Sequence, residues 1–240
     1  MIAKKIDPKR NLLLAALQPI EFTRLLPFLE LVEMPVGYVI YESGQTLDHV
    51  YFPINAVIAL LHVMKNGSVA ESAVVGNEGL VGISLLMGGG STPSRAVVQI
   101  MGYGFRLSAE VVKQEFDKGG PMLRLILRYA QALITQMAQS AVCNRHHSID
   151  QQLSRFLLVN LDRLDHGEIA MTQESISNML GVRREGITAA ASKLQKMNIL
   201  KYSRGKIIVL DRTALEHCSC ECYALVKLEY DRLLPQAEIG

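Results

Sequence analysis

The stretch MTQESISNMLGVRREGITAAASKLQKMNILKYSRGKIIVL, residues 171–210, decides the fold of the C-terminal half of the chain. Thr172 precedes an apolar-periodic run and is the expected N-cap of a first helix. Gly181 supplies the positive φ with which that helix would end. A second helix is predicted from about Arg184 to Lys196, because its apolar residues recur at helical spacing. The stretch therefore predicts two helices joined by a sharp turn, followed by a short β-hairpin, or wing, around residues 203–206.

The same stretch is strongly basic. From Arg183 to Lys206 it has seven Lys or Arg residues and one acidic residue, a net charge of +6, whereas the whole chain has a formal net charge of +2. Basic surfaces attract the phosphate backbone of nucleic acids by counterion release, whatever the base sequence. A solvated amphipathic helix is the alternative, but it does not account for the turn, the small Ala face and the hairpin together. We therefore predict a unit that binds double-stranded DNA.

Length and composition indicate a two-domain protein that is neither exported nor membrane-bound. A chain of 240 residues with 49% hydrophobic content can bury two modest cores. No uncharged apolar run reaches the ~18 residues of a membrane span, and the first residues lack a signal-peptide cleavage site. Three of the four cysteines lie within five residues. This spacing is unsuited to disulfide bonds that cross-link a fold, and it favours a reducing compartment. We expect a cytoplasmic protein.

The N-terminal half is acidic and has the pattern of a β-sandwich. Residues 21–115 carry five basic and nine acidic residues, so this half is not expected to contact nucleic acid. A short lead-in helix ending at Pro19 precedes β-rich runs that alternate with turn signals. The clearest predicted hairpin lies at Asn66-Gly67, since both residues tolerate the positive φ of a type I′ turn. The runs YVIY, HVYF, AVIALLHV, VAESAVV and RAVVQI predict a sandwich or jelly roll.

A long helix of low net charge is predicted from Pro121 to Val142. Its apolar residues form two adjoining stripes, of which one can rest on the chain's own sandwich and the other on a second copy. A single buried helix with a wide apolar face is the alternative. A polar break at 144–148, which explains His146 and His147 without a ligand role, would separate it from a helix over 149–164. The predicted dimerisation residues are Leu123, Ile126, Leu127, Ala130, Leu133, Ile134 and Met137.

This order of elements resembles the cyclic-AMP receptor protein/FNR (Crp/Fnr) family of bacterial transcription regulators. The likeness covers about residues 30–211 and is strongest at IxxxLGVxREGI (176–187) and GYVIYESGQTLDHVYFPI (37–54). It implies an α+β chain with an N-terminal β jelly roll like a cyclic-nucleotide-binding domain over 1–120, a long dimerisation helix over 121–144, and a C-terminal winged helix-turn-helix with a C-terminal helix over 145–240.

The resemblance also implies a function and partners. The expected function is a homodimeric, sequence-specific transcription regulator controlled by a signal sensed in the N-terminal domain. Its implied partners are DNA with a two-fold operator, a second copy of the chain, RNA polymerase and a small-molecule effector. The sequence has no nucleophile elbow, P-loop, dinucleotide fingerprint or H-E-x-x-H motif, so an enzyme is not expected.

The resemblance assigns base reading to the start of the second helix. Arg184 would bond guanine in the major groove and Glu185 would accept a hydrogen bond from cytosine. Ala189 stands where the family often has a further Arg, so the operator preference should differ from that of well-known members. Phosphate contacts are expected outside this pair. The full predicted DNA-binding set is Arg183, Arg184, Glu185, Thr188, Ser192, Thr172, Arg204 and Lys206.

The sensor half departs further from the family's pattern. Members that bind a cyclic nucleotide carry a Gly-Glu pair for the ribose and an Arg-Ser or Arg-Thr pair before an Ala for the phosphate. Here Ile83 follows the glycine, and the pair before the Ala is inverted to Ser-Arg. An arginine paired with a nearby carboxylate is the alternative to a cyclic-nucleotide site. The candidate effector-binding residues are Glu78, Gly82, Ser94, Arg95 and Ala96.

The sequence HCSCEC, residues 217–222, leaves two other functions open. On one continuous helix Cys218 and Cys222 would share a face with His217 beside them, but one short helix cannot surround a tetrahedral ion. Buried thiols without a ligand are the alternative. An FNR-type iron–sulfur cluster is not expected, since the first 142 residues contain no Cys. The alternative functions are a thiol- or metal-responsive regulator using His217, Cys218, Cys220 and Cys222, and a ligand- or partner-binding module that does not bind DNA.

Overall fold

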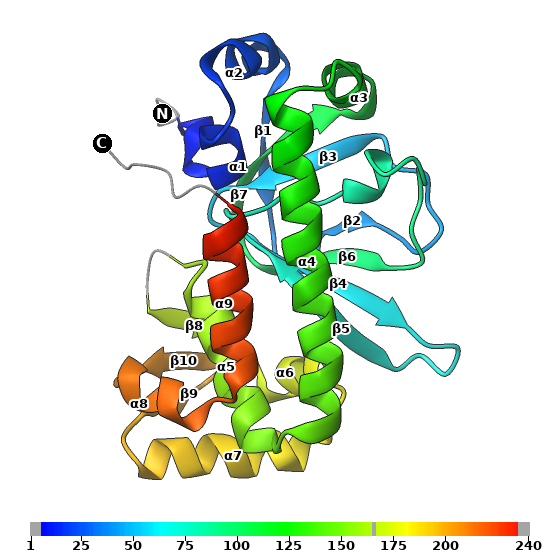
Figure 1. The fold of residues 1–240 in the computed structure, drawn as a ribbon. Coiled ribbons are helices and arrows are strands. Elements are labelled where there is room, and N and C mark those ends of the chain that lie inside the picture. The colour runs from blue at the N-terminus through cyan, green and yellow to red at the C-terminus, as the bar shows by residue number, and fades with distance from the viewer. Residues whose placement is uncertain (1–5, 165–166, 235–240) are drawn as a thin grey trace, which may run out of the picture.

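The computed structural model describes residues 6–164 and 167–234 (Figure 1). Its N-terminal part is a sandwich of two antiparallel sheets with strand orders β1-β7-β3 and β2-β6-β4-β5. The five predicted β-rich runs are strands β2 to β6, which confirms the predicted sandwich. The strands are β1 (Glu30–Met34), β2 (Val39–Tyr41), β3 (His49–Pro53), β4 (Val57–Val63), β5 (Val69–Val75), β6 (Arg95–Ile100) and β7 (Gly102–Ser108).

Short helical segments flank the sandwich. They are η1 (Pro8–Arg10), α1 (Leu12–Ala15), α2 (Pro19–Leu25), η2 (Leu26–Phe28), η3 (Ile83–Leu85) and α3 (Ala109–Asp117). The prediction that Pro19 ends a single lead-in helix is wrong, because Pro19 begins α2. A proline is well suited to the first turn of a helix, where its missing N–H has no intrahelical partner.

The predicted type I′ hairpin at Asn66-Gly67 is also wrong in its turn type. The connection joins β4 to β5 as expected, with Val63 paired to Val69. Gly67 has φ 82°, whereas Asn66 is not among the residues with positive φ. The Gly67 N–H donates to the Met64 carbonyl, so the loop is longer than the two-residue turn that the sequence suggested.

The long helix α4 (Pro121–His146) leads from the sandwich to the C-terminal half. It runs 26 residues, four beyond the predicted end, so the predicted break shrinks to His147 and Ser148. Ser148 caps α5 (Ile149–Leu161) by accepting a hydrogen bond from the Gln151 N–H. One face of α4 packs on the sandwich, where Tyr129 is fully buried and its hydroxyl donates to the Leu80 carbonyl at 2.8 Å.

The C-terminal half is a helical head with a small three-stranded sheet. Its remaining elements are β8 (Glu168–Ala170), α6 (Gln173–Leu180), α7 (Arg184–Lys196), β9 (Leu200–Ser203), β10 (Lys206–Val209), α8 (Arg212–Cys218) and α9 (Glu221–Leu233). Strand β8 pairs with β10 and joins the small sheet to the segment that leads into α6. The last helix, α9, returns from the head and lies beside α4 (Figure 1). There Gln131 donates to Glu229 at 3.1 Å.

Two main apolar cores support these two parts, as the composition predicted. The first fills the sandwich and includes the inner face of α4. The second lies within the head and includes Leu157, Ile176 and Leu194. Val57 and Val74 of the sandwich also belong to the second core, so the head packs directly against the sandwich. A buried hydrogen bond of 3.2 Å from Gln99 to Asn160 crosses the same boundary.

Glu71 of β5 predicts a pH dependence of folding stability. Its Oε2 is buried and has no hydrogen-bond partner among the residues that the structure describes, and burial raises the pKa of this carboxyl from 4.5 to about 8. Between these two values only the unfolded chain releases the proton, so the free energy of unfolding falls as pH rises. In urea unfolding, the free energy of unfolding of Glu71→Gln relative to that of the wild type should increase by about 1–3 kcal/mol from pH 5 to pH 8. A difference that stays constant over that range would contradict this assignment.

Candidate nucleic-acid interface

Helices α6 and α7 form the predicted helix-turn-helix. Thr172 caps α6, since its Oγ1 accepts a hydrogen bond from the Ser175 N–H at 3.0 Å. Met171 and Ile176 are both buried in the core of the head. Gly181 ends α6 with φ 65°, and α7 begins three residues later at Arg184, with Arg183 as its N-cap. The local signals in residues 171–187 therefore specify both helices and the turn.

Gly181→Ala should destabilise the head. A side chain at this left-handed position costs about 1–2 kcal/mol, because its Cβ crowds the following carbonyl oxygen. The free energy of unfolding measured in urea should fall by that amount. Gly167→Ala is the matched control, since Gly167 lacks a positive φ and has open space around an added Cβ. An equal loss in the two variants would show that the turn conformation is not the cause.

Helix α7 buries one face and exposes the other. Its apolar residues, including Ile187 and Leu194, pack into the head. The predicted base- and phosphate-contacting residues of α7 point away from that core, and Arg183, Arg184, Glu185, Thr188 and Ser192 are all exposed. The Thr188 hydroxyl lies within hydrogen-bond distance of Gln173 Oε1 at 2.6 Å and of the Arg184 carbonyl at 3.0 Å. These bonds fix the Thr188 side chain close to the start of α7.

The wing lies beside the start of α6. Its strands pair in the order β8-β10-β9, with Lys206 opposite Ser203. Arg204 and Gly205 form the two-residue turn, and their φ angles of 49° and 78° match a type I′ hairpin. The wing was predicted at this place. Lys206 forms an ion pair of 2.8 Å with Glu168 across the sheet, which partly neutralises its charge.

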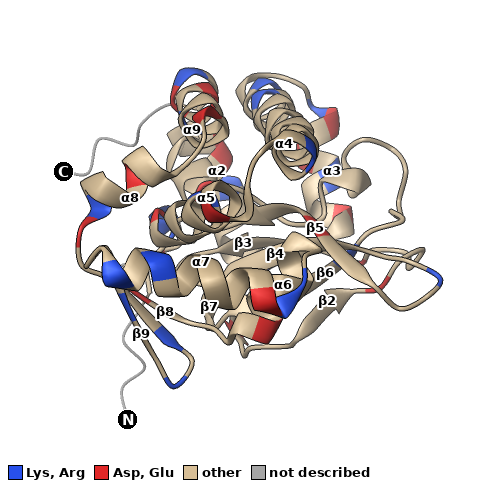
Figure 2. Cartoon of the chain, turned by 90° about the horizontal axis from the view of Figure 1, so that it is seen from below, with Lys and Arg blue, Asp and Glu red and all other residues tan. Residues whose placement is uncertain are grey.

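A hollow between the helix-turn-helix and the wing brings three predicted residues together. Thr172, Arg184 and Arg204 border it, next to Tyr202 and Gly205. Figure 2 shows Lys and Arg residues on α7 and on the wing when the head is viewed from below. Among the described residues Arg184 and Arg204 have no ion-pair partner, so their charges are available to an external anion.

A family model for Crp-like helix-turn-helix domains matches residues 151–218. The chain carries a Crp-like helix-turn-helix domain. This domain runs from α5 to the end of α8 and contains the wing. A search of the curated proteins finds no match to the sequence.

About four fifths of the chain shares its fold with solved structures that include regulators of the Crp/Fnr family. FixK2 from Bradyrhizobium japonicum is 17% identical, with a TM-score of 0.70 over 80% of this chain and 98% of that one. A regulator of the CRP family from Thermus thermophilus is 14% identical, with a TM-score of 0.63 over 78% and 96%. The c-di-GMP-responsive regulator CLP from Xanthomonas campestris is 14% identical, with a TM-score of 0.62 over 80% and 99%.

The predicted dimerisation residues fall on different sides of α4. Ile126 and Leu133 are buried in the chain's own core, so the prediction that they contact a second copy is wrong. Leu127 and Ile134 are 55% and 59% exposed. Leu123, Ala130 and Met137 are half-buried between the two faces. The chain thus covers one of the two predicted stripes and leaves the other open.

The two charged residues of the predicted effector-binding set, Arg95 and Glu78, form ion pairs with different partners. Arg95 forms an ion pair of 3.3 Å with Glu42, which is the alternative arrangement that the sequence allowed. Glu78 instead pairs with Arg163 of the head at 2.7 Å, and both side chains are largely buried. Gly82 has φ 102° at the start of η3, and Ser94 and Ala96 are buried. The charged members of this set are thus each neutralised from within the chain.

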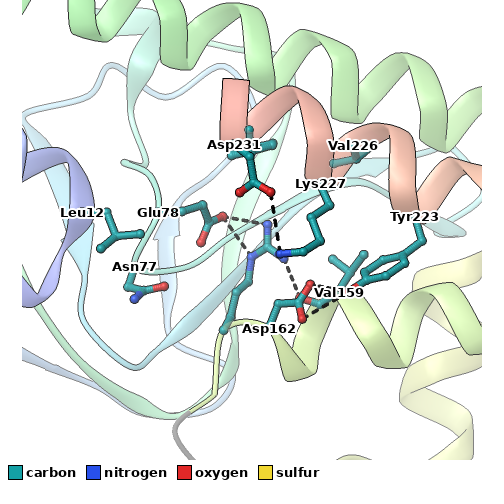
Figure 3. A pocket seen from close by; sticks show the side chains of 11 residues that line it. Leu12, Asn77, Glu78, Val159, Asp162, Tyr223, Val226, Lys227 and Asp231 are labelled. Carbon is teal, nitrogen blue, oxygen red and sulfur yellow. Dashed lines mark hydrogen bonds and ion pairs between the residues drawn. The ribbon is translucent and has the colours of Figure 1, made fainter. Parts of the chain in front are cut away.

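A pocket of about 190 Å³ lies where the sandwich, α5 and α9 meet (Figure 3). Glu78, Asp162 and Tyr223 are among its lining residues, and Glu78 forms an ion pair with Arg163, which also lines it. Sites for drug-sized ligands usually occupy 300–1,000 Å³. The pocket is therefore small for a nucleotide, and its polar groups already bind one another.

The structure divides the predicted metal candidates. Helix α8 ends at Cys218 and α9 begins at Glu221, so 217–222 are not one helix. His217 and Cys218 are not in the group that the structure gathers, whereas Cys220 and Cys222 lie beside Cys143 and His147. Cys143 was not identified as a ligand candidate from the sequence, and His147 was assigned to a polar break without a ligand role. The available signal was their spacing of four residues, which places them on one side of a helix end.

No helix among the residues that the structure describes is long and apolar enough to cross a membrane.

Proposed function

We propose that the chain is a cytoplasmic, homodimeric, sequence-specific DNA-binding transcription regulator of the Crp/Fnr type. The observation that carries this proposal is the start of α7, where Arg183, Arg184 and Glu185 are exposed and Arg184 borders the same hollow as Arg204 of the wing. The Crp-like domain and the shared regulator fold support it. The site is suited to reading DNA and not to catalysis, so an enzymatic role is no part of the proposal.

In this proposal the residues of the head have two tasks. Arg184 and Glu185 read base edges in the major groove, where Arg donates to guanine and Glu accepts from cytosine. Arg183, Thr172, Arg204 and Lys206 contact phosphates, which position the head without specifying sequence. Thr188 and Ser192 lie further along the exposed face of α7 and contact the same groove.

The open stripe of α4 forms the dimer contact. Leu127, Ile134 and Ala141 are exposed and follow one another at intervals of seven residues, and Ala130 and Met137 lie between them. This is the spacing with which two helices pack along a common seam. Two heads related by the resulting two-fold axis would fit half-sites about one DNA turn apart.

The N-terminal domain senses the signal, and the response passes through α4 to the head and to RNA polymerase. A cyclic nucleotide is not part of this proposal, because Arg95 and Glu78 are already paired with Glu42 and Arg163. The neighbour CLP is described as responsive to c-di-GMP, which supports a small-molecule effector for this fold. An effector that binds only the folded chain should raise its melting temperature in a thermal-shift screen.

Selection of genomic fragments tests the proposal. Purified full-length chain is mixed with sheared genomic DNA and excess bulk competitor at ~150 mM salt, and bound fragments are sequenced. The proposal expects a few fragments enriched over bulk DNA that share a two-fold motif. Binding without preference for any fragment would overturn it.

A further inference from the structure

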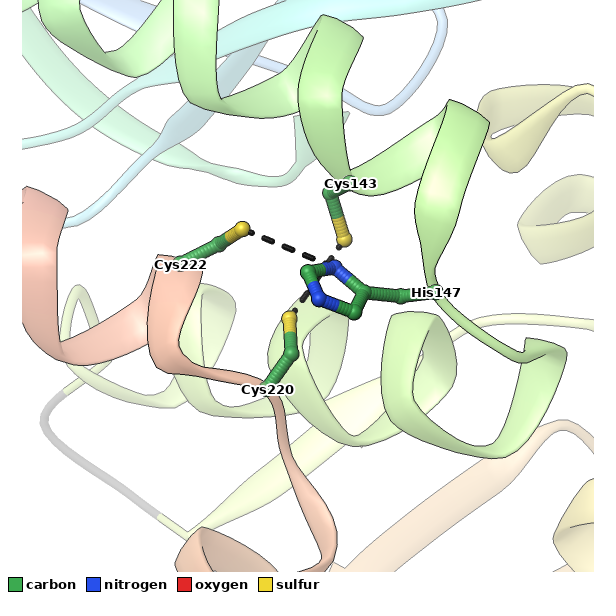
Figure 4. A group of neighbouring side chains, drawn as sticks. All are labelled: Cys143, His147, Cys220 and Cys222. Atoms are coloured by element: carbon green, nitrogen blue, oxygen red, sulfur yellow. Dashed lines mark hydrogen bonds between the residues drawn. The ribbon is translucent and has the colours of Figure 1, made fainter.

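Four potential metal ligands converge where the long helix meets the C-terminal helix. Cys143 lies in the last turn of α4 and His147 directly follows that helix. Cys220 is the N-cap of α9 and Cys222 lies in its first turn. The ligand atoms of these four side chains all lie within 4.8 Å of one another, with the thiols and the imidazole facing a common centre (Figure 4).

Two of the six distances between ligand atoms match those around one tetrahedral ion. Cys143 Sγ is 3.5 Å from Cys220 Sγ, and Cys222 Sγ is 3.6 Å from His147 Nδ1. A tetrahedral zinc site with Zn–S bonds of about 2.3 Å and a Zn–N bond of about 2.0 Å places its ligand atoms about 3.5–3.8 Å apart. Three thiolates and one imidazole are among the ligand sets that hold structural zinc.

The site is closed to solvent, as structural zinc sites are. The three cysteines are at most 4% exposed and form a small core of their own. The His147 side chain is 12% exposed. Four protein ligands leave no open coordination position for a substrate or a catalytic water, so the arrangement points to a structural ion and not to a catalytic one.

Side chains next to the ligands would orient the His147 ring and balance the charge of the site. His147 Nε2 lies 3.3 Å from the Glu221 carboxylate, which orients the ring and leaves Nδ1 free to bind a metal. Arg155 is 7% exposed, and within the described part of the chain its Nε has no hydrogen-bond partner. The guanidinium of Arg155 interacts electrostatically with Cys143 and Cys222. Three thiolates around a divalent ion leave one net negative charge, which this guanidinium would balance.

The positions of the ligands in the chain give the ion a mechanical role. The two pairs, Cys143 with His147 and Cys220 with Cys222, enclose the whole Crp-like domain at residues 151–218. An ion bound to both pairs holds the two ends of that domain together at the foot of α4. A link that closes a long segment of chain stabilises the folded state, because it removes conformational freedom from the unfolded one.

We propose that Cys143, His147, Cys220 and Cys222 bind one Zn²⁺ per chain and clamp both ends of the DNA-binding domain to the long helix. Binding converts three thiols to thiolates and releases three protons to solvent. His217 and Cys218 take no part. The proposal concerns the free protein and stands whether or not the chain reads DNA.

Metal content tests the ligand set. Full-length chain purified under reducing conditions should contain about one zinc per chain by elemental analysis. Cys222→Ser and His147→Ala should each reduce it below about a tenth of an equivalent, since a structural site loses most of its affinity with one ligand. Cys218→Ser and His146→Ala are the matched controls and should keep the full amount. A wild-type chain without zinc, or an equal loss in Cys218→Ser, would overturn the proposal.

Cobalt and thiol alkylation test the site in the wild-type chain, so no variant has to fold. Co²⁺ added to chelator-treated protein should give the thiolate charge-transfer band of a tetrahedral site, and Zn²⁺ should displace it because zinc binds more tightly. In the zinc-loaded chain only Cys218 should react rapidly with an alkylating reagent, whereas all four thiols should react after chelation. Absence of the cobalt band, or equal reactivity with and without zinc, would contradict the proposed site.

Discussion

Arg184→Ala is expected to weaken binding to the selected DNA by about 1–3 kcal/mol and to relax the preference at one base position. Arg184 is exposed in the first turn of α7 and has no ion-pair partner among the described residues, so its guanidinium is free to bond a guanine edge. Competition binding against a panel of single-base variants of the selected site measures both effects. The loss should be confined to one position and its two-fold mate.

Lys206→Ala is the control for this prediction. Lys206 is an exposed cation on the wing and carries no base-reading role in the proposal. Its removal should lower DNA affinity on all sequences alike. The slope of log affinity against log salt concentration should become less steep by about one unit. If both variants lost the same affinity on every sequence, the division between base readers and phosphate contacts would be wrong.

Ile134→Arg should convert the dimer to a monomer and reduce affinity for a two-fold site by about 10²–10⁴-fold. Ile134 is 59% exposed on the open stripe of α4, so a charge there would be buried without a partner against a second copy. A monomer binds each half-site separately and loses the high effective concentration of the second head. Sedimentation at several concentrations and binding to full and half sites measure the two effects.

Ile20→Arg makes the same chemical change away from α4. Ile20 lies in α2 and is 64% exposed, so its replacement should alter neither the oligomeric state nor DNA affinity. A dimer that persists in Ile134→Arg, with DNA affinity unchanged, would remove the open stripe from the proposed interface.

Local signals allowed the helix-turn-helix to be predicted from the sequence. The Thr172 cap, the positive φ of Gly181 and the turn at Arg204-Gly205 each depend on residues within a few positions of one another. Such signals act before tertiary packing and survive in the fold. The sandwich strands were predictable for the same reason, since alternation and turn residues are local.

The features that could not be predicted from the sequence depend on tertiary packing. Helical spacing separated the two stripes of α4, but only the position of the sandwich shows that Ile126 is covered and Leu127 is not. The Asn66 turn and the role of Pro19 depended on loop length and helix register, which single residues do not fix.

The ligand group was the largest omission of the sequence analysis. Cys143 and Cys220 are 77 residues apart, and the return of α9 to α4 brings them together. Because three cysteines lie close together at 218–222, Cys218 was predicted as a ligand candidate. Helix α8 ends at Cys218, and this residue does not lie with the other three cysteines. Glu78 was similarly assigned to an effector, because its partner Arg163 lies 85 residues later.

A hydroxyl-radical footprint of the full-length chain on a selected genomic fragment tests whether the chain reads DNA as a two-fold regulator. We expect two protected patches related by a two-fold axis, with centres about 10 base pairs apart or a multiple of that spacing, and loss of protection with Arg184→Ala at equal protein concentration. Uniform protection along the fragment, or the same footprint on unrelated DNA, would contradict a two-fold, sequence-reading regulator.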